Sequence, residues 1–382
     1  MRSISDTMTR LAAMKARSGT SQAQGGKDRL ADLTGFGSNP GALRARTYVP
    51  AGLAAGAPLV VVLHGCTQNA AGYDQGSGWS HMADRHGFAL LFPEQQRMNN
   101  ANLCFNWFVP DDIRRDGGEV LSIRQMIDGM AAEHGIDRSR IFVTGLSAGG
   151  AMAAALLATH PDVFAGGAII AGLPFGSATT IPQAFDRMRG QGMPDPRALQ
   201  DRLRDASDHE GPWPTVSIWH GTADATVAPA NADALLAQWA KAHGLSATPR
   251  METVDGQSRK VWTDAQGRDV LELISIAGMG HGTPLDTSVG GQAMPFMIDA
   301  GISSTAHIAA FWGITSGQRA QEHPAKASKS REAKPLDGEI LAPERPDARG
   351  AHGQSARTAA DTAKTRIAKV IDDALRSAGL LR

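Results

Sequence analysis

At residues 140–149 the chain reads Arg140-Ile141-Phe142-Val143-Thr144-Gly145-Leu146-Ser147-Ala148-Gly149. The β-branched and aromatic residues of the first half predict a short buried strand, and the small and apolar residues that continue to His160 predict a helix. Glycines on both sides of Ser147 permit a sharp turn that exposes its hydroxyl beside the N–H groups of the helix N-terminus. This context makes Ser147 a candidate nucleophile, and the alternative is a structural serine in a turn.

A candidate acid and a candidate base follow in the chain order that such a nucleophile requires. Residues 216–220 predict a strand, and Asp224 lies in the polar turn just after it. His281 lies between glycines in a loop that follows the strand-like residues 270–276. A histidine there can act as general base to Ser147, while Asp224 accepts the other ring N–H and fixes the tautomer. The three residues together predict a Ser-His-Asp triad.

Other interpretations of these residues are open at this point. Taken alone, Asp224 is typical of a turn former or of the N-cap of a helix over residues 231–239. Three further histidines compete for the role of base: His160, His220 and His307. One of them precedes the acid in the chain, and the other two belong to predicted helices. His281 therefore fits the required order best.

A second buried strand is predicted at residues 58–63, which form a continuous apolar run. This strand ends in His64-Gly65-Cys66-Thr67. Where a serine occupies such a turn, one N–H of the oxyanion hole belongs to the next residue and another to the loop after an early strand. Those positions are Ala148 and Cys66. His64, at the strand end, is predicted to be structural and to bond to neighbouring backbone.

With these motifs in place, the chain resembles the polyhydroxybutyrate depolymerase family of esterases, which are α/β-hydrolases similar to feruloyl and acetylxylan esterases. The resemblance spans about residues 43–313 and rests on the turn at Ser147 and on ordered stretches, which include His64-Gly65-Cys66-Thr67-Gln68, Phe92-Pro93-Glu94-Gln95, Cys104-Phe105-Asn106-Trp107, Trp219-His220-Gly221-Thr222-Ala223-Asp224 and Gly280-His281-Gly282. It implies Ser147, Asp224 and His281 as the triad and the N–H groups of Cys66 and Ala148 as oxyanion donors. It implies an ester substrate without choosing between polyesters and small esters.

The pattern of strands and helices predicts an α/β-hydrolase fold with a mostly parallel, doubly wound sheet. Strands are expected at about 44–49, 58–63, 88–92, 140–144, 165–171, 215–220 and 269–276, and helices at 79–86, 119–134, 148–160, 231–242 and 304–312. A hairpin is expected around residues 261–270, just before the His281 loop. We predict one catalytic domain over residues 41–314, preceded by an N-terminal extension over residues 1–40.

Two features near the predicted site have two interpretations each. Residues 176–214 are short, charged and interrupted by prolines, so they form either a small cap over the site or a plain helical connection on the sheet. Trp107 is a candidate for substrate binding, although most tryptophans are simply large core residues. Trp79, Trp213 and Trp219 are weaker candidates for the same role.

Composition and cysteine count limit the partners. Among 382 residues, 38 basic and 38 acidic side chains balance, so nothing attracts the chain to nucleic acid. We expect no cofactor and no metal, because two cysteines cannot supply the four ligands of a structural zinc. The resemblance favours a disulfide between Cys66 and Cys104, which would suit an oxidising compartment. Two buried thiols are the alternative.

Both ends of the chain differ in composition from the middle. Residues 1–26 contain no apolar segment typical of a signal peptide, and no run of about 20 apolar residues predicts a transmembrane helix. Residues 315–355 predict a disordered linker. Residues 356–382 predict an amphipathic helix, which could dock on the domain, self-associate or lie on a polymer or granule surface. The resemblance suggests an extracellular protein, whereas the N-terminus leaves a cytoplasmic one open.

Two classes of function are compared on these residues. The first is a serine esterase that hydrolyses polyhydroxybutyrate, another polyhydroxyalkanoate or its oligomers, with feruloyl or acetyl carbohydrate esters as the alternative substrates. The second is a polymer-binding or granule-associated protein with little activity. A complete triad with both oxyanion positions favours the enzyme, because binding alone does not require them.

Overall fold

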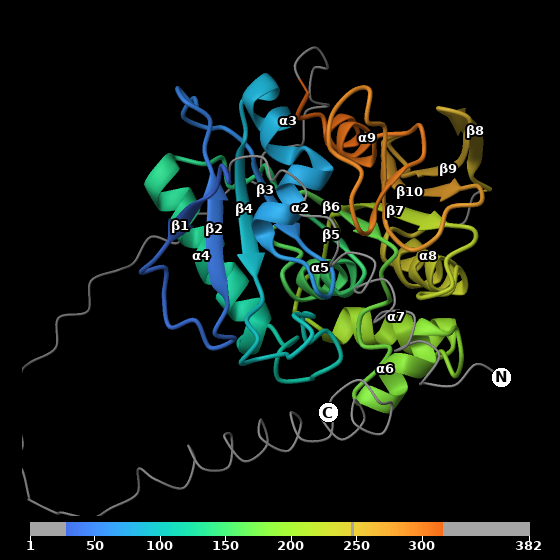
Figure 1. Ribbon diagram of the computed structural model, residues 1–382. Helices are drawn as coiled ribbons and strands as arrows, with labels where there is room; N and C mark the ends of the chain where they lie inside the picture. Colours follow the sequence, from blue (N-terminus) through green and yellow to red (C-terminus); the bar gives the residue numbers. More distant parts are fainter. Residues whose placement is uncertain (1–27, 246–247, 316–382) are drawn as a thin grey trace, which may run out of the picture. The chain divides into compact units, whose positions relative to one another are not determined.

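The central element is a ten-stranded sheet, seen in a computed structural model that describes residues 28–245 and 248–315 (Figure 1). The strands follow the spatial order β1-β2-β4-β3-β5-β6-β7-β10-β9-β8. Their bounds are β1 (Ala31–Leu33), β2 (Arg44–Tyr48), β3 (Leu59–Leu63), β4 (Ala89–Glu94), β5 (Ile141–Leu146), β6 (Gly166–Ile170), β7 (Thr215–Gly221), β8 (Arg250–Val254), β9 (Gln257–Thr263) and β10 (Asp269–Ile276). A separate parallel pair consists of β11 (Thr283–Leu285) and β12 (Met297–Asp299).

The middle of the sheet is parallel, which confirms the predicted mostly parallel architecture. From β4 across to β10 all neighbouring strands pair in parallel, and only the two edges, β1-β2-β4 and β10-β9-β8, are antiparallel. The carboxyl ends of β3, β5, β7 and β10 therefore lie at one edge of the sheet. Cys66, Ser147, Asp224 and His281 follow these four ends in turn, while Cys104 and Trp107 lie in the loop after β4.

Helices cover both faces of the sheet, as a doubly wound fold requires. Along β3, Leu59, Val61 and Leu63 belong to one buried apolar cluster, while Val60 and Val62 belong to another on the opposite face. A strand that is apolar on both sides is buried only if both faces are covered. Figure 1 shows α2 and α3 on one side of the strands and α4 on the other. The helices are α2 (Ala70–Ser77), α3 (Trp79–His86), α4 (Gly118–His134), α5 (Ala148–Thr159), α6 (Ile181–Met188), α7 (Pro196–Asp205), α8 (Ala230–Ala242) and α9 (Ser304–Phe311).

The N-terminal extension predicted for residues 1–40 differs from the structure in its last part. Residues 31–33 form β1, which pairs antiparallel with β2 and extends the sheet by one edge strand. Ion pairs hold it there: Arg44 lies 2.9 Å and Arg46 lies 3.2 Å from Asp32. The three residues of β1 show no alternation of apolar and polar side chains, so the sequence does not predict this strand.

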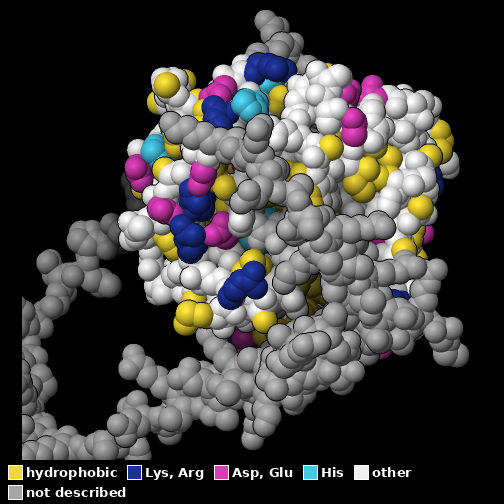
Figure 2. Space-filling view, in the orientation of Figure 1, with side chains coloured by type: hydrophobic (Ala, Val, Ile, Leu, Met, Phe, Trp, Pro, Cys, Tyr) yellow, Lys and Arg dark blue, Asp and Glu magenta, His cyan; other side chains and the backbone are white. Residues whose placement is uncertain are grey.

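Several predicted segments lie outside the described residues. These are the first 27 residues of the chain, most of the linker predicted for 315–355, and the helix predicted for 356–382. Within the described ranges, no helix is long and apolar enough to cross a membrane. On the face drawn in Figure 2, acidic and basic side chains are interspersed, in keeping with the net charge of zero.

A buried ion pair joins the predicted hairpin of β9 and β10 to the rest of the sheet. Glu272 on β10 is 2% exposed and receives Arg259 of β9, whose Nε lies 2.7 Å from its Oε2. The other carboxylate oxygen accepts a hydrogen bond of 2.6 Å from Ser217 Oγ on β7. Three neighbouring strands are thus tied through one carboxylate in the body of the two strands that carry the acid and histidine loops.

Removing only one partner of this pair should be strongly destabilising. We expect Arg259→Met to lower the free energy of unfolding by about 3 kcal/mol, because it leaves the Glu272 carboxylate buried and unpaired. The double variant Arg259→Met with Glu272→Gln should recover most of that loss, since the amide oxygen still accepts from Ser217. Urea denaturation of the three proteins checks this, and equal losses in both variants would contradict it.

Candidate active site

Ser147 occupies a strained turn between β5 and α5. Its backbone has φ 57° and ψ −116°, a conformation that residues other than glycine rarely adopt. A Cβ added to Gly149 would lie 2.5 Å from the carbonyl oxygens of Leu63 and His64, so only glycine lets α5 begin directly against the end of β3. Strained backbone of this kind concentrates at functional sites. The turn lifts Ser147 out of the ladder at the carboxyl edge of the sheet.

Asp224 and His281 meet at the same edge. The Nδ1 atom of His281 lies 2.7 Å from Oδ2 of Asp224, and both residues are buried. The other carboxylate oxygen accepts backbone N–H bonds of 2.9 Å from Thr226 and Val227. Both carboxylate oxygens are thus hydrogen-bonded, and the two backbone bonds to one oxygen hold the other in place toward the imidazole.

Backbone contacts between the two loops hold the pair together. The N–H of Ala223 donates to the carbonyl of Met279 at 3.0 Å. A Cβ on Gly221 would lie 2.3 Å from that same carbonyl oxygen, so this position also requires glycine. The acid loop after β7 and the histidine loop after β10 therefore touch because their strands are parallel neighbours.

Electrostatics keeps Asp224 in its charged form. Burial raises the pKa of Asp224. The hydrogen bond and charge of His281, together with the N–H of Val227, lower the pKa by more than burial raises it, so it lies below its usual range. Because an ionised carboxylate only accepts, Nδ1 of His281 carries the proton of this bond. In the neutral form of the ring, Nε2 of His281 is then the acceptor, which is the atom a general base uses.

The competing histidines have other partners. His220 is buried with Nε2 2.9 Å from the carbonyl of Val227 and 3.6 Å from Oδ2 of Asp224. Burial lowers the pKa of His220, so it stays neutral and holds the backbone of the acid loop. His307 pairs with Asp255 at 2.8 Å, and His160 lies beside the hydroxyl of Thr159. Among these histidines, His281 alone forms the short bond to Asp224.

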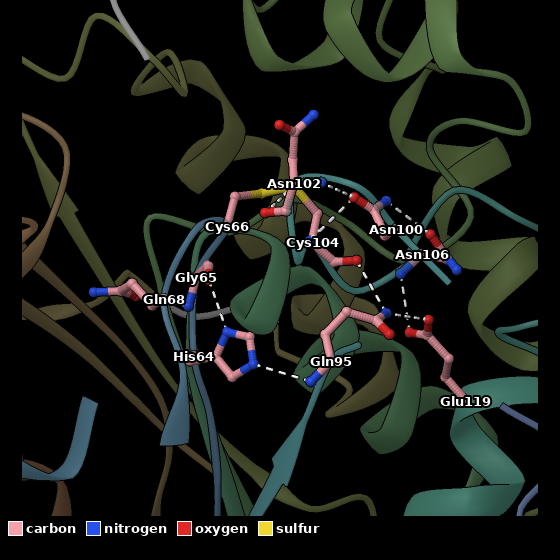
Figure 3. Close-up of a disulfide and its surroundings, with 10 residues drawn as sticks. All are labelled: His64, Gly65, Cys66, Gln68, Gln95, Asn100, Asn102, Cys104, Asn106 and Glu119. Carbon is pink, nitrogen blue, oxygen red and sulfur yellow. Dashed lines mark hydrogen bonds between the residues drawn. A yellow bond between two sulfur atoms is a disulfide. The ribbon is translucent and has the colours of Figure 1, made fainter. Parts of the chain in front are cut away.

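The loop after β3 is fastened on two sides (Figure 3). Cys66 is disulfide-bonded to Cys104, and the N–H of Thr67 donates to the carbonyl of Asn102 at 2.7 Å. The backbone N–H of Cys66 belongs to this braced loop. The N–H of Ala148 is the first of α5 and so has no partner within the helix. Both positions predicted as oxyanion donors thus belong to rigid backbone beside Ser147.

His64 has the structural role expected from its position. The N–H of Gln95 donates to its Nε2 at 3.1 Å, so Nδ1 carries the proton and donates to the carbonyl of Gly65 at 2.8 Å. Burial lowers the pKa of His64, which keeps the ring neutral. The ring thereby joins the end of β4 to the loop after β3.

A buried polar network behind the disulfide was not predicted from the sequence. Gln95 donates to the carbonyl of Cys104 at 3.0 Å and to Oε1 of Glu119 at 2.6 Å, while Oε2 of Glu119 accepts the N–H of Asn106 at 2.9 Å. Glu119 is fully buried, and burial together with the charge of Asp112 raises its pKa well above the usual range. Gln95 falls in a motif of the resemblance, but Glu119 carries no signal, because a lone glutamate in a helix is ordinarily exposed.

Trp107 lies in a small apolar cluster at this edge. The ring is 6% exposed and packs edge-to-face against Phe108 at 5.6 Å between centroids. The buried cluster contains Trp107, Ala148, Ala151, Leu173, Ala178, Ala184 and Val227. Trp79 and Trp219 are fully buried core residues, and the partly buried Trp213 packs on Trp239. Trp107 is therefore the tryptophan placed beside the first residue of α5.

The segment over residues 176–214 contains two helices that pack on different parts of the domain, and its role as a cap stays a prediction. Its first helix, α6, contributes Ala184 and Met188 to the cluster around Trp107. Its second helix, α7, buries Leu199 and Leu203 and packs against α8, where Gln238 donates to the Leu199 carbonyl at 3.0 Å. Only α6 borders the site, while α7 is a connection packed on the domain.

Residues 28–245 and 248–315 contain no group of His, Cys, Asp and Glu able to hold a metal.

Comparison with known proteins assigns the family. A family model described as "Esterase PHB depolymerase" matches residues 43–259. The chain belongs to this family. It is 47% identical over 291 residues to poly(3-hydroxyalkanoate) depolymerase C of Paucimonas lemoignei, covering 75% of this chain and 70% of that protein. It is 31% identical over 270 residues to feruloyl esterase B of Talaromyces stipitatus, covering 68% and 74%.

Relatives with carbohydrate substrates in their names support the same fold. Probable acetylxylan esterase A of Aspergillus flavus is 31% identical over 262 residues, covering 66% of this chain and 83% of that protein. The solved acetyl xylan esterase of Aspergillus awamori superposes with a TM-score of 0.64 at 24% identity, covering 75% and 99% of the two chains. The protein is thus a serine carboxylic ester hydrolase with an α/β-hydrolase fold, as the motifs predicted.

The bridge between Cys66 and Cys104 should matter more for turnover than for substrate binding. We expect the double variant Cys66→Ser with Cys104→Ser to fold but to lose about tenfold in kcat on a short-acyl chromogenic ester, because a looser loop aims one oxyanion N–H less well. KM should change little. The free energy of unfolding of the variant should also be lower by about 3 kcal/mol. An unchanged kcat in a protein with that loss of stability would show that the bridge has no part in positioning the loop.

Proposed function

We propose that this enzyme hydrolyses esters through Ser147, His281 and Asp224, with the N–H groups of Cys66 and Ala148 as the oxyanion hole. The observation that carries the proposal is the 2.7 Å bond from His281 to the buried Asp224, at the edge of the sheet where Ser147 holds a strained turn. Structural serines and histidines have no need of either feature.

In this mechanism each residue has one task. Ser147 Oγ attacks the ester carbonyl while Nε2 of His281 takes its proton, and Asp224 stabilises the imidazolium that forms. The two N–H groups bind the oxyanion of the tetrahedral intermediate. His281 then gives the proton to the departing alcohol oxygen, which leaves an acyl-enzyme on Ser147. Water attacks the acyl group as His281 takes its proton, and His281 then returns that proton to Ser147 Oγ as the acyl C–Oγ bond breaks and the acid is released.

We infer that the substrate is a poly(3-hydroxyalkanoate) or its oligomers. Support comes from the 47% identity to a depolymerase over 75% of this chain, against 31% to the feruloyl and acetylxylan esterases. The second candidate is a feruloyl or acetyl carbohydrate ester, because the same family scaffold covers both. A polymer-binding protein with little activity is disfavoured, since nothing in binding requires an oriented base and acid.

An extracellular site of action follows as part of the proposal. The disulfide at the oxyanion loop would persist in an oxidising compartment, whereas cytosolic reductants keep such thiols reduced. Activity confined to the cytoplasm of the native host, with both cysteines reduced, would overturn this assignment.

Loss of any triad residue should abolish most turnover without unfolding the protein. We expect Ser147→Ala and His281→Ala each to lower kcat by about 10⁵-fold and Asp224→Asn by about 10⁴-fold on a short-acyl ester. The double variant of Ser147 and His281 should be little worse than either single variant, because triad residues act as a unit. Steady-state kinetics, with circular dichroism as a check of folding, provides the measurement.

A matched histidine serves as control for these variants. His307→Ala removes a partly exposed ring that pairs with Asp255, outside the proposed machinery, and should leave kcat within about twofold of the parent. A folded His281→Ala enzyme with near-normal turnover would eliminate the proposed base.

The substrate class can be decided by direct competition of esters. We expect kcat/KM on 3-hydroxybutyrate oligomers to exceed that on methyl ferulate and on acetylated xylose by at least about tenfold, which corresponds to roughly 1.4 kcal/mol of differential transition-state binding. Product chromatography on the three substrates, with the Ser147→Ala enzyme as the blank, measures this. Faster turnover of the feruloyl or acetyl ester would favour the second candidate.

A further inference from the structure

A cleft of about 220 Å³ opens beside the proposed catalytic residues. Thr67 lies on one side of it and directly follows Cys66 in the oxyanion loop. Phe296 lies on the other side, with its ring edge-to-face against His281 at 6.2 Å between centroids. Thr67 and Phe296 both have positive φ, 64° and 65°, which marks backbone held under strain at this site. A ligand in the cleft would therefore touch the oxyanion loop at Thr67 and the ring of Phe296, which packs against His281.

The two walls of the cleft differ in chemistry. Met294, Pro295 and Phe296 form an apolar wall, and Gln68, Arg97 and Asn102 face it with hydrogen-bonding groups. Gln68 spans the walls, since its Oε1 accepts the N–H of Gly65 at 2.8 Å and its Nε2 lies 3.4 Å from the Pro295 carbonyl. In Figure 3 the amide of Asn102 points away from the disulfide and its network, and no hydrogen bond is drawn to it.

Charge in the cleft is positive and uncompensated. Among the described residues that line the cleft there is no Asp or Glu. Arg97 is exposed and donates from Nη1 to the carbonyl of Ala101 at 3.0 Å, and no carboxylate of the described residues pairs with it. The guanidinium is thus anchored at one nitrogen, while its remaining N–H groups are available to a carboxylate.

We propose that this cleft binds the carboxyl-terminal unit of a hydroxyacid oligomer and that Arg97 receives its terminal carboxylate. A polyester chain offers carbonyl acceptors and apolar side groups but no donors along its length, which matches one apolar wall and one wall with donor groups. A volume of about 220 Å³ is below the ~300–1,000 Å³ of pockets that enclose a whole ligand, and this favours a chain end. The inference rests on the proposed hydrolysis at Ser147.

The chemistry of the polymer fixes which part of the substrate this is. In a hydroxyacid oligomer the free carboxylate lies on the alcohol side of every ester bond. The cleft therefore holds the leaving group: the C–O bond breaks, the acyl part stays on Ser147, and the alcohol oxygen takes the proton from His281. The product released from the cleft is a hydroxyacid whose carboxylate was bound by Arg97. Arg97 would thus determine specificity for free chain ends.

The test compares the linear dimer of 3-hydroxybutyrate with the same dimer carrying a neutral terminal amide. Each contains one ester bond, and the two differ only in the charge at the proposed position. We expect Arg97→Gln to lower kcat/KM on the free acid about fivefold, mainly through KM, and to change it less than twofold on the amide and on p-nitrophenyl butyrate. Arg97→Lys should keep part of the preference. Added salt should reduce the preference of the parent enzyme.

A control and the opposing results keep the test decisive. Arg138→Gln removes an exposed arginine that precedes β5, at the opposite end of that strand from Ser147. It should leave kcat/KM unchanged on both the free acid and the amide. Equal losses on acid and amide would mean that Arg97 only supports its loop through Ala101, and no loss on either would mean that the carboxylate binds elsewhere. Both results overturn the proposal. Failure of the proposed function is separate, because it appears as turnover that survives Ser147→Ala.

Discussion

The close approach of helix α5 to the end of strand β3 is the constraint on which the rest of the site depends. Glycine at position 149 allows contact with the carbonyl oxygens of Leu63 and His64, where a Cβ would lie only 2.5 Å away. The same contact forces the chain at Ser147 into a strained turn. The loop that leaves β3 contains Cys66, so the turn and this loop lie next to each other by construction. One packing contact thus brings together the candidate nucleophile and both candidate oxyanion donors.

Rigid supports surround this contact, and they come from distant parts of the chain. The disulfide and the Gln95–Glu119 network hold the oxyanion loop, while the parallel pairing of β7 with β10 brings Asp224 to His281. A buried carboxylate such as Glu119 costs free energy unless it is hydrogen-bonded, and here donors face both of its oxygens. Contacts that hold the loops in place matter for catalysis, because a small displacement of an oxyanion donor reduces the rate steeply.

Substrate choice depends on different parts of the molecule from catalysis. The relatives of this chain include a polyhydroxyalkanoate depolymerase and esterases named for feruloyl and acetylxylan substrates. The strand ends that carry the proposed triad can serve all of them. The cleft is instead formed by loops after β3, after β4 and between β11 and β12, and these loops contribute Gln68, Arg97 and Phe296. Arg97, which has no acidic partner among the described residues, gives a simple electrostatic means of selecting anionic substrate ends.

Much was decided by the sequence alone. The strand-like runs at 58–63 and 140–144, the glycines around Ser147, and the order of Asp224 and His281 predicted a parallel α/β sheet and the candidate triad, because these signals are local. Strand β1 escaped prediction, since it is held by ion pairs to Asp32 rather than by apolar alternation. Only the tertiary structure shows how each ring faces the acid: His281 Nδ1 lies 2.7 Å from Asp224 Oδ2, whereas His220 Nε2 lies 3.6 Å away and bonds to the Val227 carbonyl. It also decided the burial of Glu119 and the cleft at Arg97, because such sites arise where loops far apart in sequence meet at one edge of the sheet.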